Sequence, residues 1–186
     1  MGMPAQHTEW TAGMARALPD DGKRYEVLDG KLFVSPAPSF THQRAVALLY
    51  EILAPYARTH GIGETMVSPA DIEFSATRLV QPDIFVIPVV PGRPTRAWRD
   101  ITRLLLAAEV LSPSTARGDR YTKRIVFQDE GVPDYWIVDL DARVFERWRP
   151  SDQRPEILGE VLHWQPASAT APLTIDLVRY FADVWR

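Results

Sequence analysis

Two carboxylates interrupt apolar stretches of the sequence. Asp83 stands in QPDIFVI and Glu109 in LLLAAEVLS, and both stretches have the composition of buried strands. An ionised carboxylate in apolar surroundings is costly unless a cation compensates it. Carboxylates at strand ends are natural ligands of Mg²⁺, which takes few protein oxygens and keeps several waters. The pair therefore predicts a divalent-metal site; the alternative is that each acid is salt-bridged or lies on an exposed strand edge.

A lysine beside such a pair would complete a set of groups suited to phosphodiester hydrolysis. The lysine can orient or deprotonate the attacking water and offset charge in the transition state. Lys123 lies on a predicted helix, about two turns or roughly 12 Å from a start near Thr115, so its side chain can reach back toward a strand end. The alternative is a solvated lysine that pairs with Asp119 at i, i+4.

The predicted elements mix strands and helices, which favours an α/β sheet with helices on its faces. Asp29-Gly30 joins two short alternating strands and is a preferred pair for a type I′ hairpin turn. The predicted order is a helix over 8–18, a hairpin over 24–36, a helix from Ser39 or Thr41 to about His60, strands over 65–74, 79–90 and 104–112, a helix over 115–131 with Ser114 as N-cap, a hairpin over 134–149, a strand over 157–164 and a helix over 175–185.

Four phrases occur in a fixed order along the chain: Q-P-D-I, A-E-V-L-S-P-S-T, D-x-x-x-K and G-V-P-D-Y-W-I-V-D, preceded by RYEVLDGKLFVSPAPSFTH. This set resembles the Uma-type family of endonucleases within the PD-(D/E)XK superfamily, over roughly residues 8–148. The resemblance implies an α/β, restriction endonuclease-like fold with a mixed central sheet flanked by helices and an N-terminal β-hairpin. We expect one domain over 1–186, with 1–20 as an N-terminal helical extension and 150–186 as a C-terminal strand and helix.

The resemblance also assigns the site. Asp83 is the aspartate of the PD element, and Glu109 is the glutamate that follows it. Leu111 stands where the superfamily usually has its lysine, and Lys123 on the next helix matches the lysine of Uma-type sequences. The implied activity is Mg²⁺-dependent hydrolysis of DNA, with Mn²⁺ able to substitute, and the backbone carbonyl of Val110 is an expected further metal ligand by analogy.

Further residues match the family phrases or lie near them. Glu26 is a candidate catalytic acid that ligates metal or orients water, or else an exposed strand residue. His42 contacts phosphate or caps the start of its helix. Arg117 and Arg120 are expected to bind the DNA backbone, because residues 93–124 carry eight basic and three acidic side chains while the rest of the chain is −8. Three other groups have open roles: Asp71 and Glu73 line the site or face water, Asp119 orders Lys123, and Tyr135 and Trp136 pack in a strand.

The composition excludes several other chemistries. There is no cysteine, and the four histidines have no H-x-x-x-H spacing, so zinc sites are not indicated. No G-x-S-x-G, Walker or G-x-G-x-x-G motif occurs, and we expect no organic cofactor. No membrane span or secretory signal is indicated, which favours a cytoplasmic protein. By analogy with restriction-type folds we expect a homodimer. The competing interpretation is a catalytically inactive nuclease-fold protein that binds nucleic acid or serves as an interaction module.

Overall fold

The structure is a computed structural model that describes residues 9–90, 92, 95–113 and 115–186. Its centre is a six-stranded sheet in the order β10-β9-β8-β7-β6-β3. All neighbouring strands are antiparallel except β7 and β8, which are parallel. The strands are β3 (Gly63–Val67), β6 (Ile84–Pro88), β7 (Leu106–Val110), β8 (Tyr135–Asp139), β9 (Val144–Trp148) and β10 (Glu156–Leu158).

A second sheet of four strands lies beside the central sheet, in the order β2-β1-β5-β4. Its strands are β1 (Arg24–Leu28), β2 (Lys31–Ser35), β4 (Ile72–Ser75) and β5 (Arg78–Val80), and the short helix α1 (Ala12–Arg16) packs on β1. Asp29 and Gly30 both have positive φ, at 48° and 75°, as the type I′ turn requires. The predicted hairpin is therefore confirmed. A separate two-stranded ribbon joins β11 (Val161–Trp164) to β12 (Leu173–Asp176).

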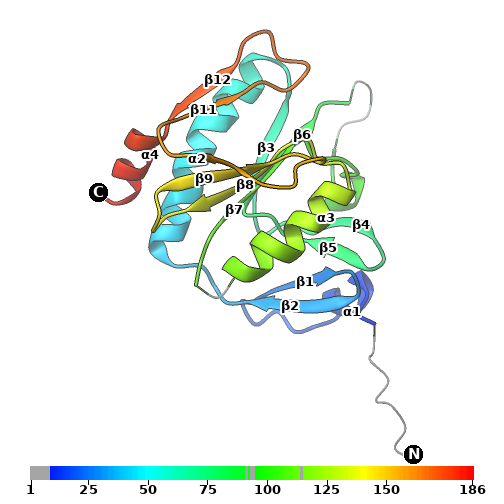
Figure 1. The fold of residues 1–186 in the computed structure, drawn as a ribbon. Helices are drawn as coiled ribbons and strands as arrows, with labels where there is room; N and C mark the ends of the chain where they lie inside the picture. The colour runs from blue at the N-terminus through cyan, green and yellow to red at the C-terminus, as the bar shows by residue number, and fades with distance from the viewer. Residues whose placement is uncertain (1–8, 91, 93–94, 114) are drawn as a thin grey trace, which may run out of the picture.

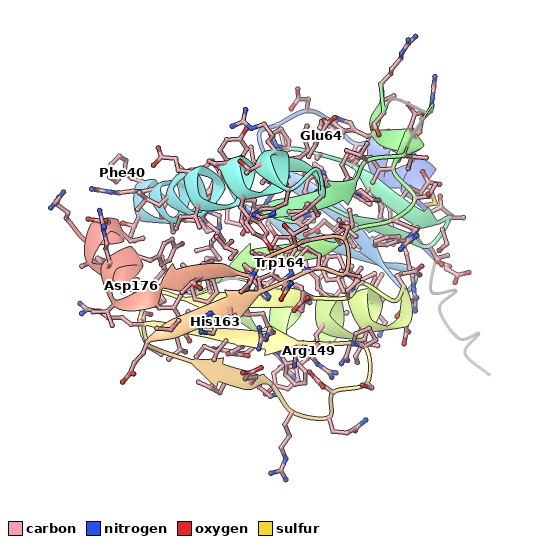
Figure 2. The ribbon with its side chains drawn as sticks, turned by 90° about the horizontal axis from the view of Figure 1, so that it is seen from above. Phe40, Glu64, Arg149, His163, Trp164 and Asp176 are labelled. Atoms are coloured by element: carbon pink, nitrogen blue, oxygen red, sulfur yellow. The ribbon has the colours of Figure 1, made fainter. Side chains whose placement is uncertain are left out.

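Helices cover both faces of the central sheet (Figure 1). On one face lies α2 (Phe40–Thr59), where the Ser39 hydroxyl accepts a hydrogen bond from the His42 amide and so caps the helix. On the other face lies α3 (Arg124–Asp129), which continues from η2 (Gly118–Lys123), a stretch of π-helix. A terminal helix, α4 (Leu177–Val184), packs against α2, with Asp176 and Phe40 at the same end of the molecule (Figure 2). In the described part of the chain, no helix combines the length and apolar character needed to cross a membrane.

Alternating side chains of the central strands build one core on each face, as the two-residue period of a strand requires. On β8, Trp136 and Val138 join Leu49 and Leu53 of α2, whereas Tyr135 and Ile137 pack on the α3 side with other buried residues. Tyr135 and Trp136 are thus core residues, as expected. Because both faces are covered, β6, β7 and β8 are almost wholly buried, which explains why their sequences are continuously apolar.

Two predicted strands are wrong because each one divides between the two sheets. The strand expected over 65–74 is β3 and β4, with Pro69 between them, and the strand expected over 79–90 is β5 and β6, with Pro82 between them. Proline has no amide hydrogen for a strand ladder, so the pairing stops there and the chain passes from one sheet to the other. Asp83 therefore lies at the junction of the two sheets, directly before β6, and not within a strand.

Other boundaries differ from the sequence predictions in smaller ways. The first helix is shorter than expected, and the strand predicted over 157–164 is β10 and β11, with Gly159 between them. The last predicted helix begins with strand residues of β12 before α4. The predicted cap Ser114 lies outside the described residues. A short 3₁₀ turn, η1 (Trp98–Asp100), precedes β7.

Candidate active site

The four predicted catalytic side chains come from four elements and meet in one buried cluster. Glu26 lies on β1, Asp83 directly before β6, Glu109 on β7 and Lys123 at the end of η2. They expose 1%, 3%, 1% and 4% of their surface, respectively. The cluster therefore takes one residue from the second sheet, one from the junction and two from the central-sheet side. The expectation that Asp83 and Glu109 are acids in buried surroundings is confirmed by their burial.

Lys123 is the centre of an ion-pair group. Its Nζ lies 2.9 Å from Oε1 of Glu109, 2.9 Å from Oε2 of Glu26 and 3.5 Å from Oδ1 of Asp119. Burial lowers the pKa of Lys123, but the charges of Glu109, Glu26 and Asp119 outweigh it and leave the pKa raised well above its ordinary value. The alternative of a solvated lysine is wrong, although the i, i+4 pair with Asp119 is present. Lys123 is a buried ammonium.

Asp83 has a different set of partners. Its Oδ1 lies 2.5 Å from the Arg24 guanidinium, and its Oδ2 accepts from the Val110 amide and contacts Nε2 of His42, both at 2.9 Å. Burial raises the pKa of Asp83, but the hydrogen bond and charge of His42 and the charges of Arg24 and Lys123 outweigh it, so the pKa lies below its usual range. Asp83 is therefore ionised at neutral pH.

Asp119 is the least satisfied member of the cluster. It exposes 1% of its surface, and neither carboxylate oxygen accepts a hydrogen bond of normal geometry. Burial, together with the charges of Glu26 and Asp83, raises its pKa, although Lys123 and Thr115 act in the opposite direction. A buried carboxylate without hydrogen bonds is expensive, and the cost falls if the group gains a proton or a cation.

The pKa of Glu109 is raised for the same reasons as that of Asp119. Burial raises its pKa well above the ordinary value, and although Lys123 lowers it, the charges of Asp83, Asp119 and Glu26 add to the increase. Apart from His42, the cluster contains four carboxylates and two permanent cations. The carboxylates are Glu26, Asp83, Glu109 and Asp119, and the cations are Arg24 and Lys123. The fully ionised cluster therefore has a surplus of two negative charges.

Local structure fixes the positions of these groups. The Glu26 Oε1 accepts from the amide of Gln81, which ties the hairpin to the junction that carries Asp83. The buried hydroxyl of Tyr135 donates to the Asp119 carbonyl at 3.1 Å and holds η2 against β8. Short π-helical segments occur often at functional sites, and this one places Asp119 and Lys123 together.

A cleft of about 770 Å³ gives access to the cluster between the β1–β2 hairpin and η2. Glu26, Asp119 and Lys123 form part of its lining. Exposed residues of the lining include Val34, Arg117 and Tyr121. A separate hollow of about 370 Å³ lies on the other side of residues 115–118 and is lined by His42 and Arg120, among others. Glu26, Asp119 and Lys123 are thus reached from solvent along the hairpin, whereas Asp83 and Glu109 lie behind the lining of the cleft.

The two predicted DNA-binding arginines differ in their contacts. Within the described structure Arg117 is exposed and makes no hydrogen bond or ion pair. Arg120 is already engaged, because its guanidinium lies 2.6 Å from both Asp139 and Glu146. Both roles remain predictions, but only Arg117 presents a free guanidinium beside the cleft.

Arg96 and Arg103 of the basic segment lie away from the cluster. Arg96 lines a different hollow with Glu64 and Ile87, and Ile87 is four residues beyond Asp83, about 13 Å along an extended chain. Arg103 precedes β7, six residues before Glu109, and so lies toward the opposite end of that strand. Arg93 lies outside the described residues. The positive charges of Arg96 and Arg103 are therefore not gathered around the site.

Sequence reasoning missed Arg24, which contacts Asp83, and assigned Asp119 only an ordering role. A signal for Arg24 was present, because it lies two residues before Glu26 and side chains at i and i+2 share one face of a strand. Asp71 and Glu73, which had an open role, pair with Arg16 at the surface and do not line the cleft. Ser39 and not His42 caps the helix, since the His42 amide donates to the Ser39 hydroxyl, and the His42 ring contacts Asp83; the expected phosphate contact stays a prediction.

The donor groups suit a hard divalent cation in kind and in charge. They are carboxylate oxygens, they carry a surplus of two negative charges, and neither oxygen of Asp119 accepts a hydrogen bond of normal geometry. Their arrangement is less suited, because no three His, Asp or Glu side chains of the described residues stand where they could hold one ion together. Arg24 contributes to this, since it occupies one oxygen of Asp83. A cation at Asp83 would have to compete with that ion pair.

A mixed sheet with helices on both faces and a buried carboxylate–lysine cluster beside its central strands β6 and β7 defines a restriction endonuclease-like fold. A crystal structure described as "a putative nuclease belonging to DUF820 from Anabaena variabilis ATCC 29413" has this fold, with a TM-score of 0.75 and 20% sequence identity over 94% of this chain and 98% of that one. The chain belongs to the Uma2 family, described as "Putative restriction endonuclease", whose model matches residues 14–178. Among curated proteins, none matches the chain.

Proposed function

We propose that the protein is an endonuclease that hydrolyses DNA phosphodiester bonds with Mg²⁺, for which Mn²⁺ can substitute. The observation that carries the proposal is the buried surplus of carboxylates around Lys123 at the inner end of an open cleft. Burying two uncompensated negative charges costs stability, and a bound divalent cation would offset that cost. The family to which the chain belongs supports the same activity.

Asp83 and Glu109 would hold the metal, with Glu26 or Asp119 completing the oxygen ligands. A bound Mg²⁺ would polarise the phosphate and make a bound water more acidic. Lys123 is held by three carboxylates and is an ammonium, so it would stabilise negative charge on the phosphate and orient the water rather than deprotonate it. The predicted Val110 carbonyl ligand stays a prediction; the Val110 amide positions the carboxylate of Asp83.

His42 and Arg24 are positioning groups for Asp83. Together with the Val110 amide they use both oxygens of the carboxylate and keep it ionised. Because Arg24 is exposed on only 15% of its side chain, its pair with Asp83 is sheltered from water. Metal binding at Asp83 therefore requires the Arg24 guanidinium to withdraw from Oδ1.

Isothermal titration with Mn²⁺ tests the metal site directly. The wild type should bind, and Glu109→Gln and Asp83→Asn should each lose about ten-fold or more in affinity, because each removes a charged ligand. Glu64→Gln is the matched control, since Glu64 is exposed on β3 and lies outside the cluster. Equal Mn²⁺ affinity in all four proteins would refute the metal assignment.

Plasmid incubation separates hydrolysis from binding. The wild type with Mg²⁺ or Mn²⁺ should nick or linearise plasmid, and the same protein with EDTA should not. Lys123→Met should lower cleavage by at least 100-fold, the size expected for loss of one transition-state charge partner. Cleavage that persists unchanged in EDTA would contradict the proposal.

The second candidate is an inactive nuclease-fold protein that binds nucleic acid or a protein partner. The engagement of both Asp83 oxygens by protein groups favours it, because no ligand set is preassembled in the described residues. DNA binding without cleavage in any divalent metal would support this candidate. A homodimer also stays a proposal, and sedimentation equilibrium of the purified protein tests it.

A further inference from the structure

We infer that the cleft accepts an unpaired DNA strand, and that an intact duplex cannot bring its backbone to the buried cluster. The inference rests on the proposed function, because it concerns the substrate of the same site. Three features carry it: the depth of the cluster, the exposed rings along the cleft, and the scarcity of free positive charge around it.

The depth of the cluster sets the first constraint. The carboxylates and Lys123 each expose 4% of their surface or less, and a phosphate reaches Glu26, Asp119 and Lys123 by entering the cleft that they line. The cleft holds about 770 Å³, which is the size of a pocket for a small molecule and suits one or two nucleotides. A duplex is stiff, and enzymes that act at enclosed sites take single strands or extruded nucleotides. A strand without a partner can bend into the cleft.

The walls of the cleft offer a surface for bases. Tyr121 on η2 is 63% exposed, and among the described residues its ring stacks on no other ring. Opposite it, the hairpin contributes Phe33, which is half-buried, and Val34, which is 49% exposed. Exposed aromatic rings bind bases of any sequence by stacking when those bases have left the helix. In an intact duplex the faces of the bases are covered by their neighbours.

Charge around the cleft is too sparse for a duplex-binding surface. Among the described lining residues the basic side chains are Arg117 at the mouth and Lys123 inside, and Glu26 and Asp119 oppose them. Proteins that hold duplex DNA through its backbone commonly neutralise about six to ten phosphates. With one or two phosphates neutralised, the logarithm of the affinity for a single strand should fall with the logarithm of salt concentration with a slope of about −1.

A cleavage assay on a duplex with an internal bubble tests the inference. The wild-type protein with Mg²⁺ receives a fully paired 40-base-pair duplex and the same duplex with an internal unpaired stretch of six bases on each strand. Cleavage should fall within the unpaired stretch and be at least ten-fold faster than anywhere in the paired duplex. Equal rates on the two substrates would overturn the inference and leave the endonuclease proposal standing. Absence of cleavage on both substrates would refute the proposed function. The binding assay below would then decide whether the cleft prefers a single strand to a duplex.

Binding is measured by fluorescence anisotropy in Ca²⁺, with a labelled 12-nucleotide strand and its duplex. The single strand should bind at least ten-fold more tightly, with a salt slope of about −1. Tyr121→Ala should weaken single-strand binding by about 5- to 100-fold, and Tyr121→Phe should restore it, because stacking needs the ring alone. Tyr50→Ala is the control, since Tyr50 is an exposed tyrosine of α2 outside the cleft. Tighter binding of the duplex than of the single strand would overturn the inference. The same holds if Tyr121→Ala binds the single strand as tightly as the wild type does.

Discussion

The substitution Asp119→Asn should stabilise the protein in EDTA, although it changes a buried residue of the candidate active site. The change keeps the shape of the side chain and removes one of the two surplus negative charges. Asp119 is the appropriate position because neither of its oxygens accepts a hydrogen bond of normal geometry, so the amide gives up the ion pair with Lys123 and no hydrogen bond. Stability and metal binding would then respond to the same substitution in opposite directions.

The distances in the cluster give the size of the charge–charge energies that act on Asp119. At an effective dielectric constant of about 20, the pair between Asp119 and Lys123 at 3.5 Å is worth about 5 kcal/mol. Glu26 and Glu109 each lie 2.9 Å from the same Nζ, so their nearest oxygens are within about 6.4 Å of Asp119 Oδ1. Each then repels Asp119 by about 2.6 kcal/mol or more, and attraction and repulsion nearly cancel.

The cost of removing Asp119 from water decides whether Asp119→Asn raises or lowers the stability of the protein. Burying an ionised carboxylate costs several kcal/mol, whereas burying an unpaired amide costs about 1–3 kcal/mol. The variant should therefore be more stable by about 1–3 kcal/mol, which is about 2–12 °C in melting temperature for a chain of this size. The gain should depend on pH. The pKa of Asp119 is raised in the folded protein, so the folded state retains its proton to higher pH than the unfolded chain does, and the wild type loses stability as pH rises above 3.8.

Urea denaturation in EDTA at pH 5 and at pH 8 measures the effect. The difference between Asp119→Asn and wild type should be larger at pH 8 than at pH 5, because the wild-type carboxylate is more fully ionised there. Adding Mn²⁺ should stabilise the wild type more than the variant, since the wild type retains the ligand. Asp183→Asn, a change at a half-buried surface residue of α4 outside the cluster, serves as control. A variant that is less stable than wild type at pH 8 in EDTA would refute the charge reasoning.

Three further predictions concern the cations and Asp83. Lys123→Met should destabilise the protein in EDTA by about 3–5 kcal/mol by urea denaturation, because three buried carboxylates lose their common partner; an unchanged midpoint would contradict this. Arg24→Gln should bind Mn²⁺ at least ten-fold more tightly by calorimetry, because a competing cation leaves Asp83, whereas Arg16→Gln at the surface should not. The pKa of Asp83 is lowered by folding, so its contribution to stability is present above pH 3.8 and lost as pH falls through the folded-state pKa. Asp83→Asn should accordingly show a shallower loss of stability below pH 3.8, and parallel curves would count against the assignment.

The sequence was informative wherever one local rule decided the outcome. Alternation and Asp29-Gly30 predicted the β1–β2 hairpin, and apolar runs located β7 and β8. The same runs were misleading at Pro69 and Pro82, because a run of apolar residues does not reveal that its two halves belong to different sheets. The missing information is long-range, since it depends on which strands pair across the molecule.

In the candidate site, too, some features follow from the local sequence and others depend on tertiary contacts. Burial of Asp83 and Glu109 followed from their apolar neighbours, and the family resemblance supplied Lys123. The ion pair between Arg24 and Asp83 spans 59 residues and joins two sheets, so no local pattern predicts it with certainty. A count of charges treats Arg117 and Arg120 alike. Tertiary contacts distinguish them, because Arg120 pairs with Asp139 and Glu146 whereas Arg117 makes no ion pair in the described structure.

The position of Asp83 at the junction of the two sheets has a consequence for folding. Glu26 comes from one sheet and Glu109 from the other, and the chain between Pro82 and β6 is the point at which both are connected. Asp83 and Glu109 belong to neighbouring strands of the central sheet, so Glu26 joins them only when the two sheets dock. A ribosome-bound chain that ends before residue 123 also lacks the lysine. The complete cluster, and the proposed activity with it, would therefore form only after the two sheets have docked.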